Sequence, residues 1–224
     1  LDLNDIESVK TELEKGDVCA IIIEFIQGVG GLDQATKEFF EQVDVLCKAN
    51  NTLFIADEVQ SGYGRSGKFF AFQHYNVTPD IISIAKGMGN GFPIGGILIH
   101  PSIEAKFGML GTTFGGNHLA CAAGLSVLNV IHDDFLMDNV QTISEYFSKI
   151  AETIPQIKKI KGKGLMLGLE FDFEVSELRK KLIYEYHIFT GGASNKKVLR
   201  ILPPLTVQKK HINQFFEALV NALD

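Results

Sequence analysis

The stretch TLFIADEVQSGYGRSGKFFAFQHYNVTPDIISIAKGMGNG, residues Thr52 to Gly91, decides the fold. It contains two short apolar runs rich in isoleucine, and a charged residue closes each run. Asp57 follows Leu53–Ala56, and Lys86 follows Ile81–Ala85. Such runs are typical of strands buried in a sheet that is covered on both faces. We therefore expect Asp57 and Lys86 to emerge together at the carboxyl edge of a largely parallel sheet, where α/β proteins bind ligands.

An aspartate and a lysine at such an edge are the two groups that a pyridoxal phosphate enzyme requires. Lys86 can supply the amine that forms a Schiff base with the cofactor and, once released, the base that moves a proton. Asp57 can keep the pyridine nitrogen protonated by Coulomb attraction, so that the ring takes up electrons. Isolated charges at strand ends are more often ordinary surface residues. The pair alone therefore leaves both interpretations open.

Five motifs stand in a fixed order along the chain. They are IIEFIQGVGG (Ile22–Gly31), IADEVQSGYGRSG (Ile55–Gly67), PDIISIAKGMGNGFPIG (Pro79–Gly95), GTTFGGNHLACAAG (Gly111–Gly124) and VLRILPPL (Val198–Leu205). Together they resemble the class III (fold type I) pyridoxal phosphate-dependent aminotransferases, most closely the acetylornithine and succinylornithine enzymes. The resemblance implies an α/β protein of the PLP-transferase fold type I. It comprises part of a large domain, with a mostly parallel sheet covered by helices, and a small C-terminal α/β domain.

The resemblance also implies a cofactor, pyridoxal 5′-phosphate, and the residues that hold it. Lys86 and Asp57 are then the catalytic residues, and both bind the cofactor. Val59 packs on a face of the ring, and Gln60 bonds the ring hydroxyl oxygen. Thr113 reaches the phosphate of the cofactor in the other subunit of a homodimer.

Two further residues are assigned to the substrate by the same resemblance. Thr112 lies beside the substrate, and Arg200 binds one of its carboxylates. The residues themselves agree, since the glycines around Thr112 let backbone N–H groups approach an anion. An arginine in an apolar strand suits a carboxylate that pairs with its planar fork. Many relatives carry Glu at the position of Val29, and in some of them that Glu pairs with the arginine matching Arg200, so Val29 departs from the pattern.

The implied reaction is transamination, in which the δ-amino group of N-acetyl- or N-succinylornithine moves to 2-oxoglutarate in arginine biosynthesis. Two alternatives stay open. The chain can belong to another class III enzyme, such as an ornithine or 4-aminobutyrate aminotransferase or an aminomutase. It can also be a catalytically incomplete fragment that only dimerises. A yellow cofactor complex on the pure chain separates the enzymes from the fragment.

The chain divides into residues 1–133, the C-terminal part of the large cofactor-binding domain, and residues 134–224, the small C-terminal α/β domain. Helices are predicted near 5–15, 36–50, 118–131, 133–154, 177–186 and 208–223. Strands are predicted at 19–26, 96–100, 157–161 and 165–171, besides the two that carry Asp57 and Lys86 and the strand around Arg200. Compared with the family, position 1 falls within the large domain, so we expect about 40% of a full-length enzyme to precede it.

Other functions find less support. Gly62–Lys68 reads G-x-x-x-x-G-K, but Phe69 stands where a nucleotide-binding loop needs Ser or Thr. The six histidines lack metal-site spacing, so no metal is expected. A formal net charge of −6 gives no field for nucleic acid or acidic membranes. The three cysteines, Cys19, Cys47 and Cys121, are interpreted as reduced core residues, and a cytoplasmic location is expected.

Overall fold

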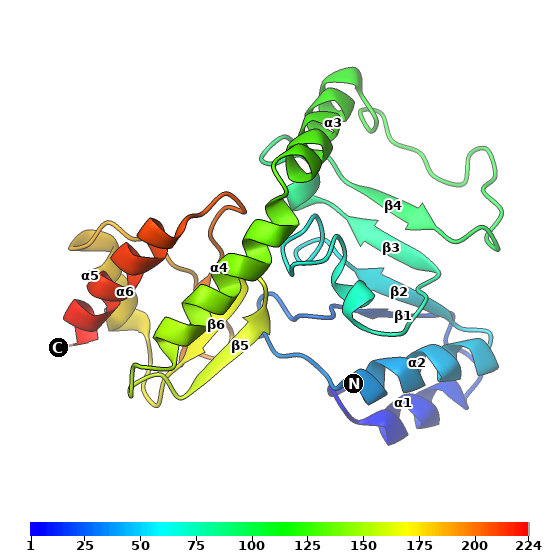
Figure 1. Ribbon diagram of the computed structural model, residues 1–224. Coiled ribbons are helices and arrows are strands. Elements are labelled where there is room, and N and C mark those ends of the chain that lie inside the picture. Colours follow the sequence, from blue (N-terminus) through cyan, green and yellow to red (C-terminus); the bar gives the residue numbers. More distant parts are fainter. Residues whose placement is uncertain (224) are drawn as a thin grey trace. The chain divides into compact units, whose positions relative to one another are not determined.

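The computed structural model describes residues 1–223, which form two compact units (Figure 1). The first unit comprises Leu1–Phe25, Gln34–Tyr63 and Phe70–Asp134. The second comprises Ile26–Asp33, Gly64–Phe69 and the chain from Phe135 onward. Two short segments from the first half of the sequence therefore belong to the C-terminal unit.

The first unit is built on a four-stranded sheet with the order β1-β2-β3-β4 (Figure 1). β1 (Ala20–Ile23), β2 (Leu53–Asp57) and β3 (Ile81–Ile84) run parallel, and β4 (Gly96–Ile99) is antiparallel to β3. The mostly parallel sheet that the sequence predicts is confirmed. Because parallel strands end at the same edge, the residues that follow β2 and β3 lie on one side of the sheet.

A helix of the first unit packs directly on this sheet. α2 (Lys37–Ala49) begins after Thr36, which caps the helix: its hydroxyl oxygen accepts the backbone N–H of Phe39 at 3.2 Å. α2 contacts β2, whereas α1 (Ile6–Leu13) packs on α2. The interior is aromatic, with the ring of Phe25 at 4.5 Å from Phe40 and 6.0 Å from Phe54.

The other face of the sheet is only partly covered. Along β2, Phe54 and Ala56 are buried, whereas Leu53 and Ile55 are half-buried, and every residue of β4 is exposed. Of the other helices of this unit, α1 stacks on α2, and α3 (His118–Asp133) contacts the turn after β3.

α3 follows a long connection from β4 and begins where the sequence predicts. The side chain of Asn117 caps it by accepting the N–H of Ala120 at 3.0 Å. Only Ala120, Gly124 and Ile131 of this helix are buried. Within residues 1–223 no single helix is long and apolar enough to cross a membrane, and only the broken pair of α3 and α4 (Leu136–Ala151) meets the length and composition required.

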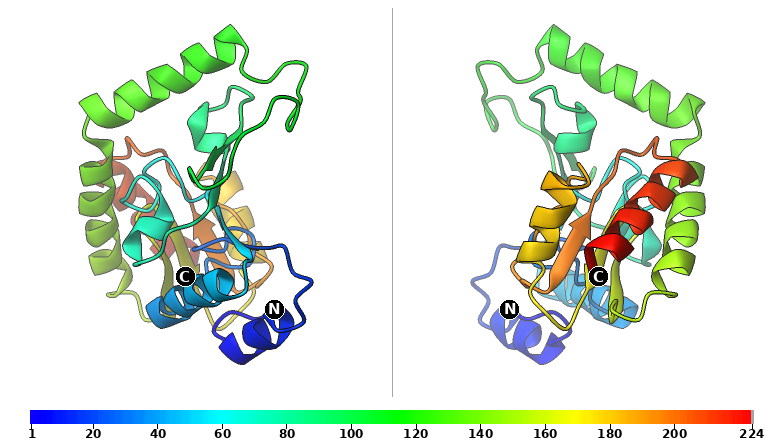
Figure 2. Two further views of the ribbon diagram at one scale, coloured as in Figure 1. Left: turned by 90° about the vertical axis from the view of Figure 1, so that its right-hand side faces the viewer. Right: turned by 90° about the vertical axis from the view of Figure 1, so that its left-hand side faces the viewer.

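The second unit has a three-stranded antiparallel sheet of order β5-β6-β7. The strands are β5 (Lys159–Lys163), β6 (Met166–Glu170) and β7 (Val198–Ile201). Its core gathers side chains from these strands and from α4, α5 (Ser176–Tyr184) and α6 (Lys209–Leu223), among them Phe147, Leu169, Leu199 and Phe215. α6 packs between its two neighbours, with α4 on one side and α5 on the other (Figure 2).

The two short early segments complete this second unit. Leu32 of Ile26–Asp33 lies against Gly168, where a Cβ atom would come 3.0 Å from Leu32 Cδ1. In Gly64–Phe69, the Arg65 guanidinium donates to the carbonyl oxygens of Leu165 and Pro203, and burial lowers the pKa of this guanidinium. No periodic pattern in the sequence marks these contacts.

The cysteines differ from the prediction in part. Cys47 on α2 is buried, and burial raises the pKa of its thiol to about 12. Cys19 and Cys121 are exposed, so the interpretation of all three as core residues is wrong. Cys19 precedes the edge strand β1, and Cys121 lies on the uncovered side of α3, which explains why an apolar sequence setting did not bury them.

Candidate functional site

Asp57 is the last residue of β2, and its carboxyl group is fixed by two hydrogen bonds. Its register partner on β3 is Ser83. Asp57 Oδ1 accepts the Ser83 hydroxyl at 3.0 Å and the backbone N–H of Val59 at 3.0 Å. Because one oxygen takes both bonds, the carboxyl plane is set while Oδ2 keeps its capacity to accept. The side chain is half-buried at the carboxyl edge of the sheet.

The residue after Asp57 anchors the turn that leaves β2. Glu58 is fully buried. Its carboxylate accepts the Ser61 hydroxyl at 2.6 Å and the backbone N–H of Phe72 at 2.8 Å, and its own N–H donates to Ser83 O at 3.0 Å. Burial raises the pKa of Glu58, and the neighbouring Asp57 charge adds to the rise. Glu58 therefore ties the turn to β3 and to the short 3₁₀ helix η1 (Ala71–His74).

Lys86 leaves the sheet at the same edge, in an unusual backbone conformation. It starts the 3₁₀ turn η2 (Lys86–Met88), two residues after β3 ends, with φ at 43°. A non-glycine residue in the left-handed region is uncommon and marks a turn that its surroundings hold in place. The turn is tight, because a Cβ at Gly89 would lie 2.3 Å from Phe92 O. The Lys86 side chain is exposed.

Val59 and Gln60 follow Asp57 in the same turn. Both are half-buried, and Val59 contributes the N–H that orients Asp57. Gln60 Oε1 is buried and has no hydrogen-bond partner among the described residues. A buried amide oxygen without a partner is unfavourable unless a ligand or water completes it. The structure thus brings Asp57, Val59, Gln60 and Lys86 to one edge of one sheet.

Thr112 and Thr113 lie in the connection that leads into α3, and both are exposed. Thr112 Oγ1 accepts the N–H of Gly115 at 3.1 Å, and a Cβ at Gly115 would come 2.2 Å from Thr112 Cγ2. A side chain at position 115 would require the Thr112 side chain to move. The structure gives Thr113 no contact with the carboxyl-edge residues in the described part of the chain.

Arg200 lies in β7 of the second unit and is half-buried there. Its Nη1 donates to Gly28 O at 2.7 Å. Its Nε is buried and, among the described residues, has no acceptor. Gly191 makes room for the side chain, since a Cβ there would lie 3.3 Å from Arg200 Nε. An arginine with one N–H engaged and a buried Nε still unpaired can accept a carboxylate on its remaining donors.

Val29 presents its side chain largely to solvent and contacts Ser194 through its backbone. The side chain is 63% exposed, and the backbone oxygen accepts the N–H of Ser194 at 2.8 Å. The neighbouring carbonyl of Gly28 is the group that meets Arg200. The sequence pointed to Val29 as the residue that bears on Arg200, and the contact with the backbone of Gly28 was not predicted.

Ser83 and Glu58 are site residues that the sequence argument did not single out. Ser83 carries a signal, because it is the polar member of the run IISI and stands opposite Asp57. Glu58 carries a weaker one, as an acid directly after a buried strand. Within residues 1–223 no group of three or more His, Cys, Asp or Glu side chains could hold a metal ion.

Comparison with known proteins gives a consistent result. The family model described as aminotransferase class-III matches residues 2–223. An acetylornithine aminotransferase of Caldanaerobacter subterraneus is 43% identical over 99% of this chain and 57% of its own length. One from Aquifex aeolicus is 42% identical over 97% of this chain and 57% of its own. The chain therefore spans a little over half the length of these curated relatives.

Solved structures share the fold. An ornithine aminotransferase from Plasmodium yoelii superposes with a TM-score of 0.90 at 33% identity, covering 99% of this chain and 61% of that one. An N-acetylornithine aminotransferase from Stenotrophomonas maltophilia superposes with a TM-score of 0.85 at 30% identity, covering 100% of this chain and 61% of that one. The fold type expected from the sequence is confirmed by these neighbours.

Proposed function

The chain belongs to the class-III aminotransferases, and from this premise we propose that it is part of an enzyme that moves the δ-amino group of N-acetyl- or N-succinylornithine to 2-oxoglutarate. The observation that carries the proposal is the carboxyl edge itself. There Ser83 and the N–H of Val59 orient Asp57, and Lys86 follows from the adjacent strand. The acetylornithine aminotransferases at 42–43% identity support the substrate class, which belongs to arginine biosynthesis.

The residues at this edge fit pyridoxal 5′-phosphate. When bound, this cofactor supplies an aldehyde that condenses with amines and a ring that spreads negative charge. The unpartnered Gln60 Oε1 marks a buried amide that a ring hydroxyl would complete. In the proposal, Asp57 holds a proton on the pyridine nitrogen through Oδ2, and Val59 packs on one face of the ring.

Lys86 is proposed as the anchor and the proton carrier. Its left-handed backbone conformation turns the chain away from β3 at the same edge of the sheet as Asp57. Its side chain is exposed and therefore accessible to a ligand. Its Nζ would hold the cofactor and then, as a free amine, would carry the proton from the substrate carbon that bears the amino group to the C4′ carbon of the cofactor. One residue thus serves both steps.

Binding of the substrate and of the phosphate is assigned to three more residues. Arg200 pairs with a substrate carboxylate through the donors that Gly28 O does not occupy. Thr112 lies beside the substrate. Thr113 reaches the cofactor phosphate of a second subunit, so the protein is proposed to act as a homodimer. The exposed position of Thr113, and the apolar residues Phe107 and Phe114 near it, support a partner at this loop.

Ornithine itself is the second candidate amino donor. It is favoured by the ornithine aminotransferases among the structural neighbours, with TM-scores of 0.90. The three free cysteines support the further proposal that the enzyme works in the reducing cytoplasm.

The test uses the full-length protein that contains this chain. Purified enzyme is given N-acetylornithine, ornithine or 4-aminobutyrate with 2-oxoglutarate, and glutamate formation is measured. Borohydride reduction followed by peptide mass spectrometry locates the cofactor, which is expected on the peptide that carries Lys86. Lys86→Ala is expected to lose both turnover and the labelled peptide while remaining folded. Labelling of another lysine would overturn the assignment, and no turnover with any donor would overturn the reaction.

A further inference from the structure

A row of three residues crosses the sheet of the second unit. The strand register places Lys161 of β5 opposite Gly168 of β6, and Gly168 opposite Arg200 of β7. Residues paired across neighbouring strands point to the same face. Two cations therefore flank a glycine, and the gap over Gly168 is filled by Leu32.

Three contacts hold the segment Ile26–Asp33 against this row of residues. Asp33 is held by Lys161 Nζ at 2.8 and 2.9 Å. Leu32 is 1% exposed and sits over Gly168. Gly28 O accepts from Arg200 Nη1 at 2.7 Å. All of these residues belong to the second unit, so the row and the segment form one body.

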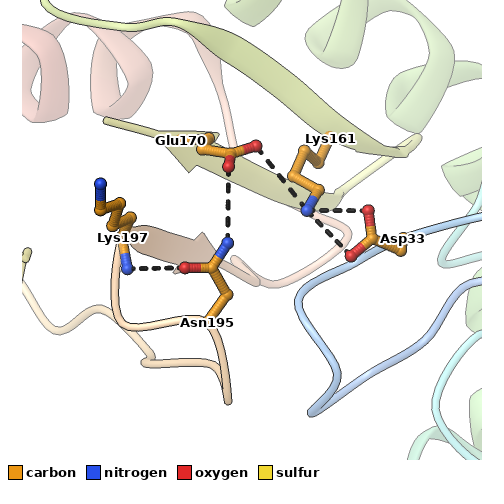
Figure 3. Close-up of polar contacts among 5 residues, drawn as sticks. All are labelled: Asp33, Lys161, Glu170, Asn195 and Lys197. Carbon is orange, nitrogen blue, oxygen red and sulfur yellow. Dashed lines mark hydrogen bonds and ion pairs between the residues drawn. The ribbon is translucent and has the colours of Figure 1, made fainter. Parts of the chain in front are cut away.

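Lys161 is the buried member of the ion pair that holds Asp33. Its side chain is only 6% exposed, and its ammonium group lies between the carboxylates of Asp33 and Glu170, the latter at 3.8 Å (Figure 3). Glu170 is in turn held by Asn195 Nδ2 at 3.4 Å. Carboxylates already surround the ammonium group, which excludes a bound anion as its role. A buried charge whose partner is removed is strongly unfavourable, so Asp33 is kept in place.

The segment that Lys161 holds is the one that orients Arg200. Within it, Gln27 N donates to Asp33 O at 3.0 Å and Leu32 N donates to Gln27 O at 2.9 Å, so the loop is closed on itself and moves as a whole. A shift at Asp33 is then passed to Gly28. The guanidinium plane of Arg200 depends on the Gly28 carbonyl, and a bidentate carboxylate contact tolerates little misplacement of that plane.

We propose that Lys161 is a positioning residue for substrate binding. Through Asp33 it seats the Ile26–Asp33 segment, so that the Gly28 carbonyl holds the Arg200 guanidinium ready for a substrate carboxylate. This inference rests on the proposed function of Arg200. It adds that a residue of β5, two strands from Arg200, influences the affinity for the carboxylate.

The experiment uses Lys161→Met in the full-length enzyme, with Lys158→Met as a matched control. Lys158 pairs with Asp172 at 3.8 Å in an exposed ion pair, and its ammonium group donates to Pro155 O at 3.0 Å rather than to the segment. KM for 2-oxoglutarate is expected to rise about tenfold in Lys161→Met while kcat stays within about twofold of the parent. The inhibition constant of glutarate, a dicarboxylate that cannot react, is expected to rise by the same factor. Lys161→Arg is expected to restore both values.

Asp33→Asn covers the case in which Lys161→Met does not fold, since Asp33 is 45% exposed, and the same rise in KM is expected. A loss confined to kcat, an equal change in Lys158→Met, or no rescue by arginine would each overturn the inference. If the parent enzyme transaminates but Lys161→Met leaves KM unchanged, this inference alone is rejected. A parent without transaminase activity rejects the proposed function, and this inference with it.

Discussion

At the scale of single residues, Asp57 shows how position decides chemistry. An aspartate at a strand end is ordinary, but this one has Oδ1 bonded to Ser83 and to Val59 N–H, so its carboxyl group is oriented before any ligand arrives. Preorganised charge is the form in which a protein assists a reaction without later rearrangement.

The first prediction concerns Asp57→Asn. The amide retains the shape of the side chain but carries no charge, so it cannot hold a proton on the pyridine nitrogen. We expect the cofactor to stay bound and kcat to fall by roughly 10²–10⁴-fold. Single-turnover kinetics and the absorbance of bound cofactor measure the two effects separately, and turnover equal to the parent's would remove Asp57 from the mechanism.

Val29 gives the second prediction. Val29→Glu places a carboxylate next to Gly28, whose carbonyl already occupies Arg200 Nη1. The new carboxylate can pair with the rest of the guanidinium and must be displaced before a substrate binds. We expect 2-oxoglutarate binding to weaken by roughly 1–3 kcal/mol, the range of a charge-assisted pair. Val29→Gln serves as the uncharged control, and an unchanged half-saturation value for Val29→Glu counts against a substrate carboxylate at Arg200.

Glu58 gives a prediction about pH. Burial raises its folded pKa above the ordinary value of 4.5, so between that value and the raised one the folded state keeps a proton that the unfolded state has lost. The free energy of unfolding must then fall as the pH rises through this interval, and Glu58 adds no slope below 4.5. Glu58→Gln removes this contribution. Urea unfolding from pH 4 to pH 7 is expected to show a shallower fall in the variant, and identical slopes would contradict the prediction.

At the scale of elements, the turn between β5 and β6 meets the segment Gly64–Phe69 very closely. Gly164 has φ at 60°, and a Cβ there would lie 2.4 Å from the backbone carbon of Ser66. Gly164→Ala is expected to cost roughly 2–4 kcal/mol of stability, from the conformation and the clash together. Gly16→Ala is the matched control, because φ is 73° and nothing lies within 4 Å. It should cost about 1 kcal/mol. Thermal unfolding of both variants tests the difference.

Most elements could be predicted from the sequence because their signals are local. Thr36 and Asn117 cap the helices that the sequence placed after them, and the apolar runs beside Asp57 and Lys86 became β2 and β3. The 3₁₀ turn at Lys86 could not be predicted, because its conformation comes from the packing of the residues after it. The helix predicted at 133–154 is shorter, since Phe135 adopts a left-handed conformation before α4 begins.

Part of the candidate site could likewise be predicted from the sequence, and part could not. Asp57, Val59, Gln60 and Lys86 come together because strand order brings their segments to one edge, and this follows from parallel pairing. The contact of Arg200 with Gly28 joins residues 172 positions apart and has no periodic signal. The division into domains at 133/134 stays a prediction, although the second unit resumes at Phe135.

At the scale of the whole molecule, a proposed dimer gives the last prediction. Phe107 and Phe114 are fully or largely exposed on the connection that carries Thr113, which is costly for aromatic rings in water. Phe107→Asp with Phe114→Asp is expected to shift the full-length protein from dimer to monomer in sedimentation velocity. Phe189→Asp, at an equally exposed ring of the second unit, is the control and should leave the mass unchanged. A double variant that stays dimeric would place the subunit contact elsewhere.

The alternation of the two units along the chain also bears on biosynthesis. Each unit consists of three segments, and the segments of the two units alternate along the chain. The helices and the sheet against which Ile26–Asp33 and Gly64–Phe69 pack all follow residue 134 in the sequence. On the ribosome, these two early segments emerge long before β5, β6 and β7 are made. The nascent chain must therefore keep them unattached until the segment from Phe135 onward has been made, so the second unit can mature only after that segment has left the ribosome.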